Sequence, residues 1–99
     1  LIMVDIDCFK SVNDTRGHPV GDIVLREVAR RLATQVRTVD RVARFGGEEF
    51  GVILVHADRA AALDVANKLC AAVRRDPVLA GETLPLNITI SAGVAMPRR

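Results

Sequence analysis

Two adjacent glycines followed by two adjacent glutamates, at residues 46–49, constrain the fold of this chain more than any other feature. Strand-forming runs flank them, in 39–45 before and in 50–55 after. Because a Gly-Gly pair tolerates the positive φ of a tight turn, we predict a β-hairpin with the glycines at its turn. An ordinary solvated turn would have the same pattern, yet this turn also places Glu48 where it could bind a metal ion.

The first seven residues form an apolar run that ends in carboxylates, which predicts a strand buried in the middle of a sheet. Side chains alternate across a strand, so Asp5 and Asp7 should share one face, and Val4 and Ile6 the other. Two carboxylates on one face repel. Beside a third one, such as that of the hairpin, they would raise one another's pKa or bind a cation, and hard oxygen ligands suit Mg²⁺. Acids exposed to water at a strand end are the alternative.

Apolar residues recur at helical spacing in two further segments, which predicts two amphipathic helices. Their members are Leu25, Val28, Ala29, Leu32 and Val36 in the first, and Ala62, Val65, Ala66, Leu69 and Val73 in the second. Asp58 could cap the second helix, Pro77 lies beyond its end, and residues 86–96 resemble a last strand. The order strand, helix, hairpin, helix, strand predicts an α+β fold of the ferredoxin-like βαββαβ type. Its sheet would have one face free for a site.

Composition is that of one compact piece of a domain: 99 residues, 49% hydrophobic and 26% charged. The net charge is +2, but all three aromatic residues are Phe and no groove-reading motif is present, so nucleic acid is not an expected partner. We see no apolar span that would contact a membrane from this segment, although the whole protein could be membrane-anchored. The two cysteines predict free buried thiols, which suits the cytoplasm.

The motifs of this chain, read together, resemble those of the GGDEF-domain family of diguanylate cyclases. Residues 8–22 form a polar stretch rich in turn formers. The matching elements are D-x-D-x-F-K at 5–10, N-D at 13–14, G-H-x-x-G-D at 17–22, GGEEF at 46–50 and S-x-G-V-A at 91–95. Each alone is unspecific, and all of them in this order are strongly specific. The one departure in the turn is glutamate for aspartate at its third position.

The resemblance implies an enzyme that joins two GTP molecules into cyclic di-GMP, on a fold similar to the polymerase palm and the nucleotide cyclases. It implies a homodimer in which each subunit holds one GTP and each 3′-hydroxyl attacks the opposite α-phosphate, releasing pyrophosphate. The resemblance spans residues 1–99, but the family's preceding D-x-L-T-G-L-x-N-R segment and its closing helix are not among them. We therefore expect a GGDEF domain truncated at both ends, and inactive as an isolated fragment.

The family's metal and catalytic roles can be carried onto matching positions. Asp5, the backbone carbonyl of Ile6, and Glu48 resemble the ligands of Mg²⁺, with Mn²⁺ as a substitute. Lys10 resembles the catalytic group that steadies the charge on the phosphates, and Glu48 also resembles the catalytic base for the 3′-hydroxyl. Lys10 as a plain surface charge is the alternative. The supporting residues would be Asp7, Gly46, Gly47 and Glu49.

The family's substrate-binding roles fall on the polar stretch. Asn13 and Asp22 resemble the residues that read the guanine edge of GTP, and His18 would line the substrate pocket. Local alternatives exist: Asn13 could form a turn with Asp14, and Asp22 could cap a helix that begins near Ile23.

Arg37 and Asp40 form an R-x-x-D element with five residues between it and Gly46, and it resembles the product-inhibition site at which the family binds cyclic di-GMP. A surface ion pair is the alternative. For the whole domain, a catalytically silent GGDEF domain acting as a GTP or cyclic di-GMP receptor is the competing hypothesis, although such members typically lose some of the site residues that are intact here. A generic interaction module would leave the acidic cluster unexplained.

Overall fold

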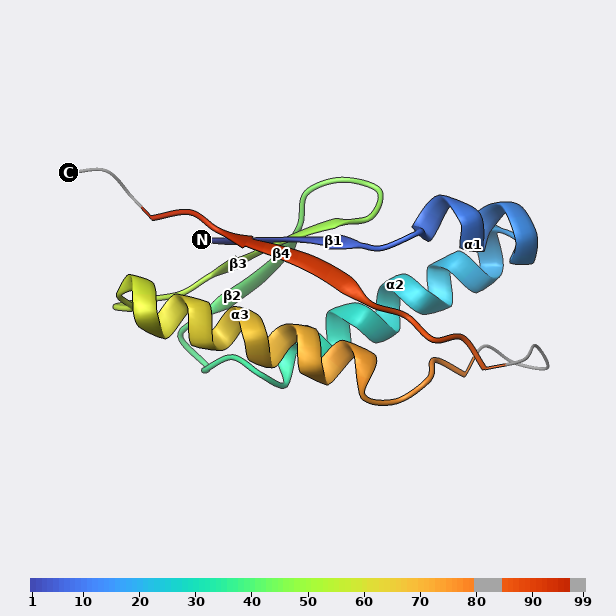
Figure 1. The fold of residues 1–99 in the computed structure, drawn as a ribbon. Helices are drawn as coiled ribbons and strands as arrows, with labels where there is room; N and C mark the ends of the chain where they lie inside the picture. The colour runs from blue at the N-terminus through green and yellow to red at the C-terminus, as the bar shows by residue number, and fades with distance from the viewer. Residues whose placement is uncertain (80–84, 97–99) are drawn as a thin grey trace.

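The computed structural model describes residues 1–79 and 85–96, which form a four-stranded antiparallel sheet and three helices (Figure 1). In chain order these are β1 (Ile2–Ile6), α1 (Phe9–Arg16), α2 (His18–Ala33), β2 (Arg41–Arg44), β3 (Glu49–Ile53), α3 (Arg59–Arg74) and β4 (Ile90–Val94). The strands lie in the spatial order β2-β3-β1-β4. This arrangement confirms the predicted α+β fold of ferredoxin-like type.

Strand β1 lies in the interior of the sheet, as its apolar sequence predicts. It pairs with β3 on one side and with β4 on the other, and short β2 forms an edge beyond β3. Val4 and Ile6 are buried and Asp5 is exposed, so the predicted alternation of faces is confirmed. Opposite Asp5 stand Glu49 in β3 and Ser91 in β4.

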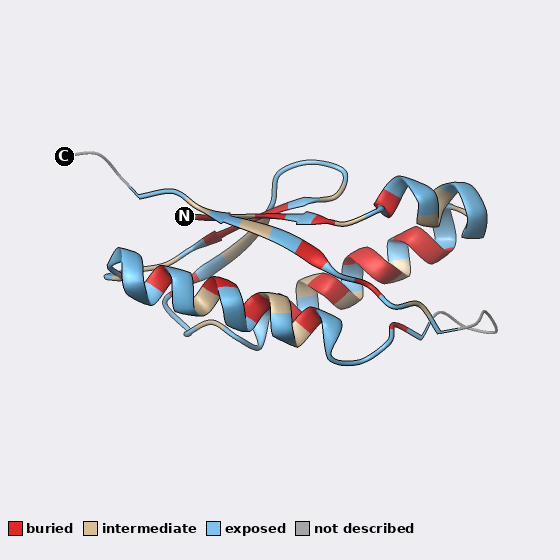
Figure 2. Cartoon of the chain, viewed as in Figure 1, coloured by how far each residue is buried: buried red, intermediate tan, exposed pale blue. Residues whose placement is uncertain are grey.

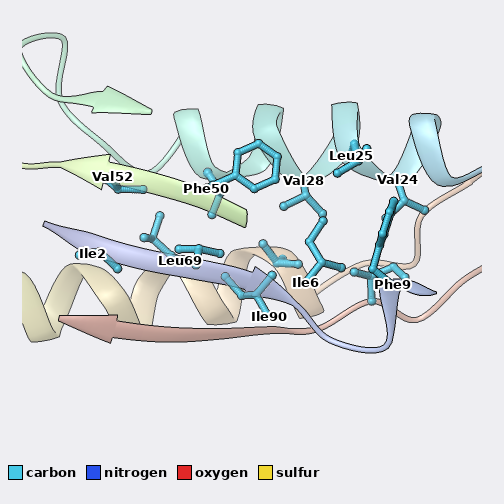
Figure 3. Packing of buried hydrophobic residues seen from close by; sticks show 14 of the residues in the cluster. Ile2, Ile6, Phe9, Val24, Leu25, Val28, Phe50, Val52, Leu69 and Ile90 are labelled. Atoms are coloured by element: carbon cyan, nitrogen blue, oxygen red, sulfur yellow. The ribbon is translucent and has the colours of Figure 1, made fainter. Parts of the chain in front are cut away.

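Helices α2 and α3 cover the same face of the sheet, whereas α1 lies beyond the end of β1 (Figure 1). Buried positions concentrate where these two helices face the strands (Figure 2). The core formed there includes Ile2, Val4, Ile6, Phe9, Val24, Leu25, Val28, Leu32, Phe50, Val52, Leu69, Val73 and Ile90 (Figure 3). Full burial of such a side chain stabilises the fold by about 1.5–3 kcal/mol. The helices therefore fix one face of the sheet and leave the face that carries Asp5 open in the described residues.

The polar stretch 8–22 is more helical than its turn formers indicate. It forms α1 and the first turns of α2, which begins at His18, well before Leu25. Gly17, with φ of 89°, separates the two helices, and Pro19 occupies the first turn of α2, where its missing N–H is harmless. The first predicted helix also ends earlier than expected, at Ala33 rather than beyond Val36.

The hairpin is present, but its strands are shorter than the predicted 39–45 and 50–55. Neither hairpin glycine has a positive φ, so that expectation is wrong. The N–H groups of Phe45 and Gly46 both donate to the Glu49 carbonyl, at 2.8 and 3.4 Å. The chain therefore reverses over several residues, and a wider turn does not need the left-handed backbone of a tight two-residue one.

The second predicted helix is confirmed as α3, and the Asp58 carboxylate caps it by accepting from the Ala61 N–H at 2.8 Å. Both cysteines are free, as predicted, but Cys8 is exposed and Cys70 only half-buried, so the expectation of buried thiols is wrong. Among the described residues, no helix has the length and apolarity needed to cross a membrane.

Candidate active site

The residues predicted to bind the metal lie on neighbouring segments of backbone, where β1 ends beside the start of β3. The Ile6 N–H donates to the Glu48 carbonyl at 3.2 Å. Asp5, the residue before Ile6, has its side chain on the open face of the sheet. Asp5 is exposed and Glu48 half-buried. The backbone thus brings Asp5, Glu48 and the Ile6 carbonyl into neighbouring positions.

This donor set fits a hard divalent cation, because it consists of oxygen atoms alone. Across residues 1–79 and 85–96, no three His, Cys, Asp or Glu side chains converge into a metal cluster. The predicted set does not require one, since it combines the carboxylates of Asp5 and Glu48 with a backbone carbonyl. Mg²⁺ usually keeps several waters and takes only one or two carboxylates from a protein.

Asp7 is held differently from Asp5. Its Oδ1 accepts from the Ser91 hydroxyl at 2.6 Å and its Oδ2 from the Thr89 hydroxyl at 2.7 Å. Its backbone N–H donates to the Thr89 carbonyl at 3.0 Å. The sequence suggested that Asp5 and Asp7 together could bind a cation, but both oxygens of Asp7 are engaged with hydroxyl groups.

The start of α1 follows Asp7 directly and was missed by sequence reasoning, because this segment was not predicted to be helical. Cys8 takes a left-handed conformation, with φ of 57°, and turns the chain from β1 into the helix. The side chain of Cys8, at the N-cap position, makes no capping hydrogen bond. Lys10 is exposed in this first turn. Helix N–H groups and a lysine at one place favour an anion such as phosphate.

The side-chain oxygen of Asn13, in α1, lies against Gly21 of α2. This oxygen, Oδ1, is buried and has no hydrogen-bond partner in the described part of the chain. A Cβ built on Gly21 would lie 1.9 Å from that oxygen, so only glycine allows this approach. Asn13 lies within α1 and does not form a turn with Asp14, which removes that alternative.

Asp22 lies inside α2, on the fourth residue after its start, and so does not cap the helix. It lines a hollow of about 240 Å³ with Leu25, Arg26 and Arg44. Leu25, Arg26 and Arg44 also line a second hollow of about 300 Å³, together with Ala29, Val42 and Phe50. His18 is exposed at the start of α2 and lines neither hollow. A polar rim beside an apolar floor suits a planar base.

Arg44 connects this hollow to the hairpin turn. Its Nε donates to the Gly46 carbonyl at 3.0 Å and its Nη2 to the Gly47 carbonyl at 2.8 Å. The sequence singled out the glycines and glutamates of the turn but gave no role to this arginine. Its forked guanidinium holds the segment that leads into Glu48.

Arg37 and Asp40 form an ion pair, with 3.2 Å between Arg37 Nη2 and Asp40 Oδ1, and only the arginine side of this pair lies at the surface. The Asp40 side chain is only 2% exposed, while that of Arg37 is 59% exposed. Asp40 accepts from the backbone and side-chain N–H groups of Arg37 and from the Val55 N–H at 3.0 Å. Arg37 chiefly, and then the Val55 N–H, lower the pKa of Asp40 from its ordinary 3.8 to about 2, against the opposing effect of burial.

A hollow of about 310 Å³ opens beside this pair. Besides Arg37 and Asp40, its lining includes His56, Asp64 and Lys68. Lys68 pairs with Asp64 at 3.1 Å, and His56 is left-handed, with φ of 55°. Sequence reasoning missed these lining residues because they come from α3 and the segment before it, far from the R-x-x-D element along the chain.

Comparison with known proteins gives consistent matches. A family model described as "Diguanylate cyclase, GGDEF domain" matches residues 1–99. Diguanylate cyclase A of Treponema denticola is 43% identical over 95 residues, which make up 96% of this chain and 25% of that protein. Response regulator PleD of Caulobacter vibrioides is 48% identical over 96 residues, 95% of this chain and 21% of that protein.

Among solved structures, the GGDEF domain of DgcB from Caulobacter crescentus in complex with c-di-GMP matches with a TM-score of 0.85 at 32% identity. The match covers 93% of this chain and 55% of that one. The chain therefore spans about a quarter of the length of the curated relatives, 25% and 21% of the two named above. By sequence and by fold, the chain belongs to the GGDEF-domain family.

Proposed function

We propose that this chain is the catalytic part of a diguanylate cyclase that condenses two GTP into cyclic di-GMP and pyrophosphate. The observation that carries the proposal is the hydrogen bond from the Ile6 N–H to the Glu48 carbonyl. It holds the hairpin turn against the end of β1, where Asp5 lies. A reaction that consumes GTP would take place in the cytoplasm, so we expect this domain to lie there even if the whole protein is membrane-anchored.

Asp5, Glu48 and the Ile6 carbonyl would hold Mg²⁺, or Mn²⁺ in its place. The ion, when bound, would neutralise charge on the phosphates. Phosphoryl transfer depends mostly on position and electrostatics, so the contribution of the chain is to orient the nucleotide and balance its charge. The Glu48 carboxylate would also accept the proton of the attacking 3′-hydroxyl.

The unpaired Oδ1 of Asn13 supports guanine as the base. Guanine presents N–H donors on its Watson–Crick edge, and Asn13 and Asp22 both offer acceptor oxygens. Adenine presents an acceptor at the corresponding ring nitrogen and would leave these oxygens unpaired. A site built to hydrogen-bond its substrate strongly rejects an analogue that leaves its buried groups unpaired. His18 would lie at the rim of this pocket.

The phosphates would extend from the base toward the start of α1. Lys10 and the N–H groups at the start of that helix, where Cys8 makes no capping bond, supply positive charge there. Gly47 adds room: a Cβ there would meet no atom within 4 Å, so this part of the turn would be open to a ligand.

One such site holds one GTP, so the condensation requires two copies of the domain facing each other. Each 3′-hydroxyl oxygen would bond to the α-phosphorus of the opposite GTP, the bond from that phosphorus to the bridging oxygen would break, and pyrophosphate would leave. The open face of the sheet, which carries Asp5, is the face on which a second copy would meet the nucleotide.

Arg37 and Asp40 would bind the product and inhibit the enzyme. The exposed guanidinium of Arg37 can reach phosphate or a guanine edge, and its anchorage on buried Asp40 limits the freedom lost on binding. The neighbouring hollow with His56 and Lys68 adds cationic or hydrogen-bonding groups. DgcB, a similar domain, has been crystallised with c-di-GMP.

The test is turnover of GTP by the full-length protein with Mg²⁺, followed by detection of cyclic di-GMP. The Glu48→Gln variant should lose at least about a hundredfold in kcat, because it removes a metal-ligand charge but keeps the side-chain size. Asp76→Asn, which removes an exposed carboxylate far from the site, is the matched control and should keep its activity.

The other outcomes are decisive as well. Near-normal activity of Glu48→Gln would refute the metal assignment, and equal use of ATP and GTP would refute the role of Asn13 and Asp22. Binding of GTP or cyclic di-GMP by the wild type without turnover would identify the domain as a receptor instead.

A further inference from the structure

The last strand of the chain contains a motif that the proposed function leaves unused. The segment 91–95, S-x-G-V-A, forms most of β4, and Thr89 stands just before it. Neither Ser91 nor Thr89 belongs to the expected metal, base or phosphate ligands. Both hydroxyl groups nevertheless point at one carboxylate, that of Asp7.

These hydrogen bonds are short, and they involve both carboxylate oxygens of Asp7. The two O–H···O distances, 2.6 and 2.7 Å, lie in the range of hydrogen bonds to an ionised carboxylate. Each hydroxyl takes a different oxygen of Asp7, and the Asp7 N–H adds a bond of 3.0 Å to the Thr89 carbonyl. Asp7 is therefore fixed at three points to a segment more than eighty residues away in the chain.

Asp7 occupies the position where β1 becomes α1. On one side, Ile6 is bonded to Glu48 through its N–H at 3.2 Å. On the other side, Cys8 turns the chain through a left-handed conformation into α1. The connection is thus held between the hairpin turn and the segment leading into β4. If Asp7 were less firmly held, the Ile6 carbonyl before it and the first N–H groups of α1 after it could also move.

We propose that Thr89 and Ser91 are positioning residues that act through Asp7 to hold the end of β1 in place for the metal and the phosphates. Asp7 orients this connection and is not itself a metal ligand. Hydrogen-bonded partners behind a metal site typically contribute 10–100-fold to metal affinity or activity. The inference rests on the proposed function, because it concerns the placement of the same ligands.

The experiment compares single and paired variants of the full-length protein. Thr89→Val and Ser91→Ala each remove one hydroxyl with little change of volume. Each should lower kcat by about tenfold and weaken Mn²⁺ binding, followed by electron paramagnetic resonance without nucleotide, by a similar factor. The preference for GTP over ATP should not change, because the base pocket on α1 and α2 is untouched. Thr89→Ser, which keeps the hydroxyl, should restore both values.

A double-mutant cycle tests the route through Asp7. In an Asp7→Ala background, adding Ser91→Ala should have no further effect on Mn²⁺ affinity, because the partner is gone. Thr15→Val is the matched control, since the Thr15 hydroxyl donates only to the Ser11 carbonyl in its own helix. Thermal melting of every variant shows whether the losses arise in folded protein.

Two results would overturn the inference. If Thr89→Val and Ser91→Ala lower only the melting temperature, with kcat and Mn²⁺ affinity unchanged, the contacts serve stability alone. If Asp7→Asn abolishes Mn²⁺ binding while both hydroxyl variants bind normally, Asp7 is a direct ligand. Failure of the proposed function is separate, since wild-type protein would then bind the metal yet form no cyclic di-GMP.

Discussion

At the scale of single residues, the absence of a side chain at Gly21 allows Asn13 to keep its position, from which Oδ1 could accept a hydrogen bond from the base. We predict that Gly21→Ala weakens GTP binding by tenfold or more. The added methyl would lie 1.9 Å from Oδ1 and 3.0 Å from Cγ of Asn13, so the asparagine must move out of place. Overpacking of this kind costs about 1–3 kcal/mol of stability.

Calorimetric titration with GTP and urea unfolding measure the two effects of Gly21→Ala. Gly93→Ala is the matched control for stability, because a Cβ there would meet no atom within 4 Å. Unchanged GTP affinity in folded Gly21→Ala protein would show that Asn13 does not contact the base.

The limits of prediction from sequence are also visible at this scale. Asp5 and Glu48 were identifiable because strand alternation and a marked turn place them. The contacts of Asp7 with Thr89 and Ser91 were not, since they join residues 82 and 84 positions apart and leave no local pattern. The sequence contains hydroxyl residues in many places, and only the register of β1 with β4 selects these two.

At the scale of elements, one buried arginine joins the two helices under the sheet. Arg31 of α2 donates to the carbonyls of Val73, Asp76 and Pro77, at 2.7, 2.6 and 3.1 Å, where α3 ends and the chain leaves it. It also donates to Glu27 at 3.0 Å. A cationic side chain thereby satisfies the carbonyls at a helix C-terminus and complements its dipole.

We predict that Arg31→Met lowers the free energy of unfolding by about 2–4 kcal/mol, because it leaves one buried and two partly buried carbonyls without this donor. Arg30→Met is the matched control: Arg30 pairs with the same Glu27 but is 64% exposed, and exposed pairs contribute about 0–1 kcal/mol. Urea unfolding followed by circular dichroism measures both. Equal losses in the two variants would show that the carbonyl contacts contribute nothing.

The elements themselves differed in how far the sequence predicted them. Helix α3 was predictable, because its apolar spacing is regular and Asp58 marks its start. Helix α1 was not, because only Phe9 and Val12 give it an apolar face among residues that usually form turns. The wider hairpin turn was missed for a related reason: a Gly-Gly pair permits a positive φ but does not require one.

At the scale of the whole molecule, the Arg37 hollow and the Asp5 site are separate but joined through the hairpin. Asp40 is bonded to the Val55 N–H, and β3 runs from Glu49, next to Glu48, to Ile53. On the proposed function, product bound at Arg37 would hold two copies apart and so prevent the two GTP sites from facing each other.

We therefore predict that Arg37→Ala raises the cyclic di-GMP concentration for half-inhibition by tenfold or more, with little change in the uninhibited rate. The loss corresponds to a charge-assisted contact of about 2 kcal/mol. Inhibition curves of full-length wild type and variant measure it, and Arg59→Ala, an exposed arginine at the start of α3, is the control. Identical curves for wild type and Arg37→Ala would leave the pair a purely structural one.

The edge strand β2 has a consequence for how copies of the protein meet. Its four residues begin and end with exposed arginines, Arg41 and Arg44. Unpaired strand edges invite other chains to add to the sheet, and positive charge on an edge discourages this. Two copies approaching along β2 would oppose like charges, so continuous sheets and aggregates are disfavoured on this side. If two copies meet as proposed, this charge leaves the open face of the sheet, and not the β2 edge, as the side on which they would approach each other and separate.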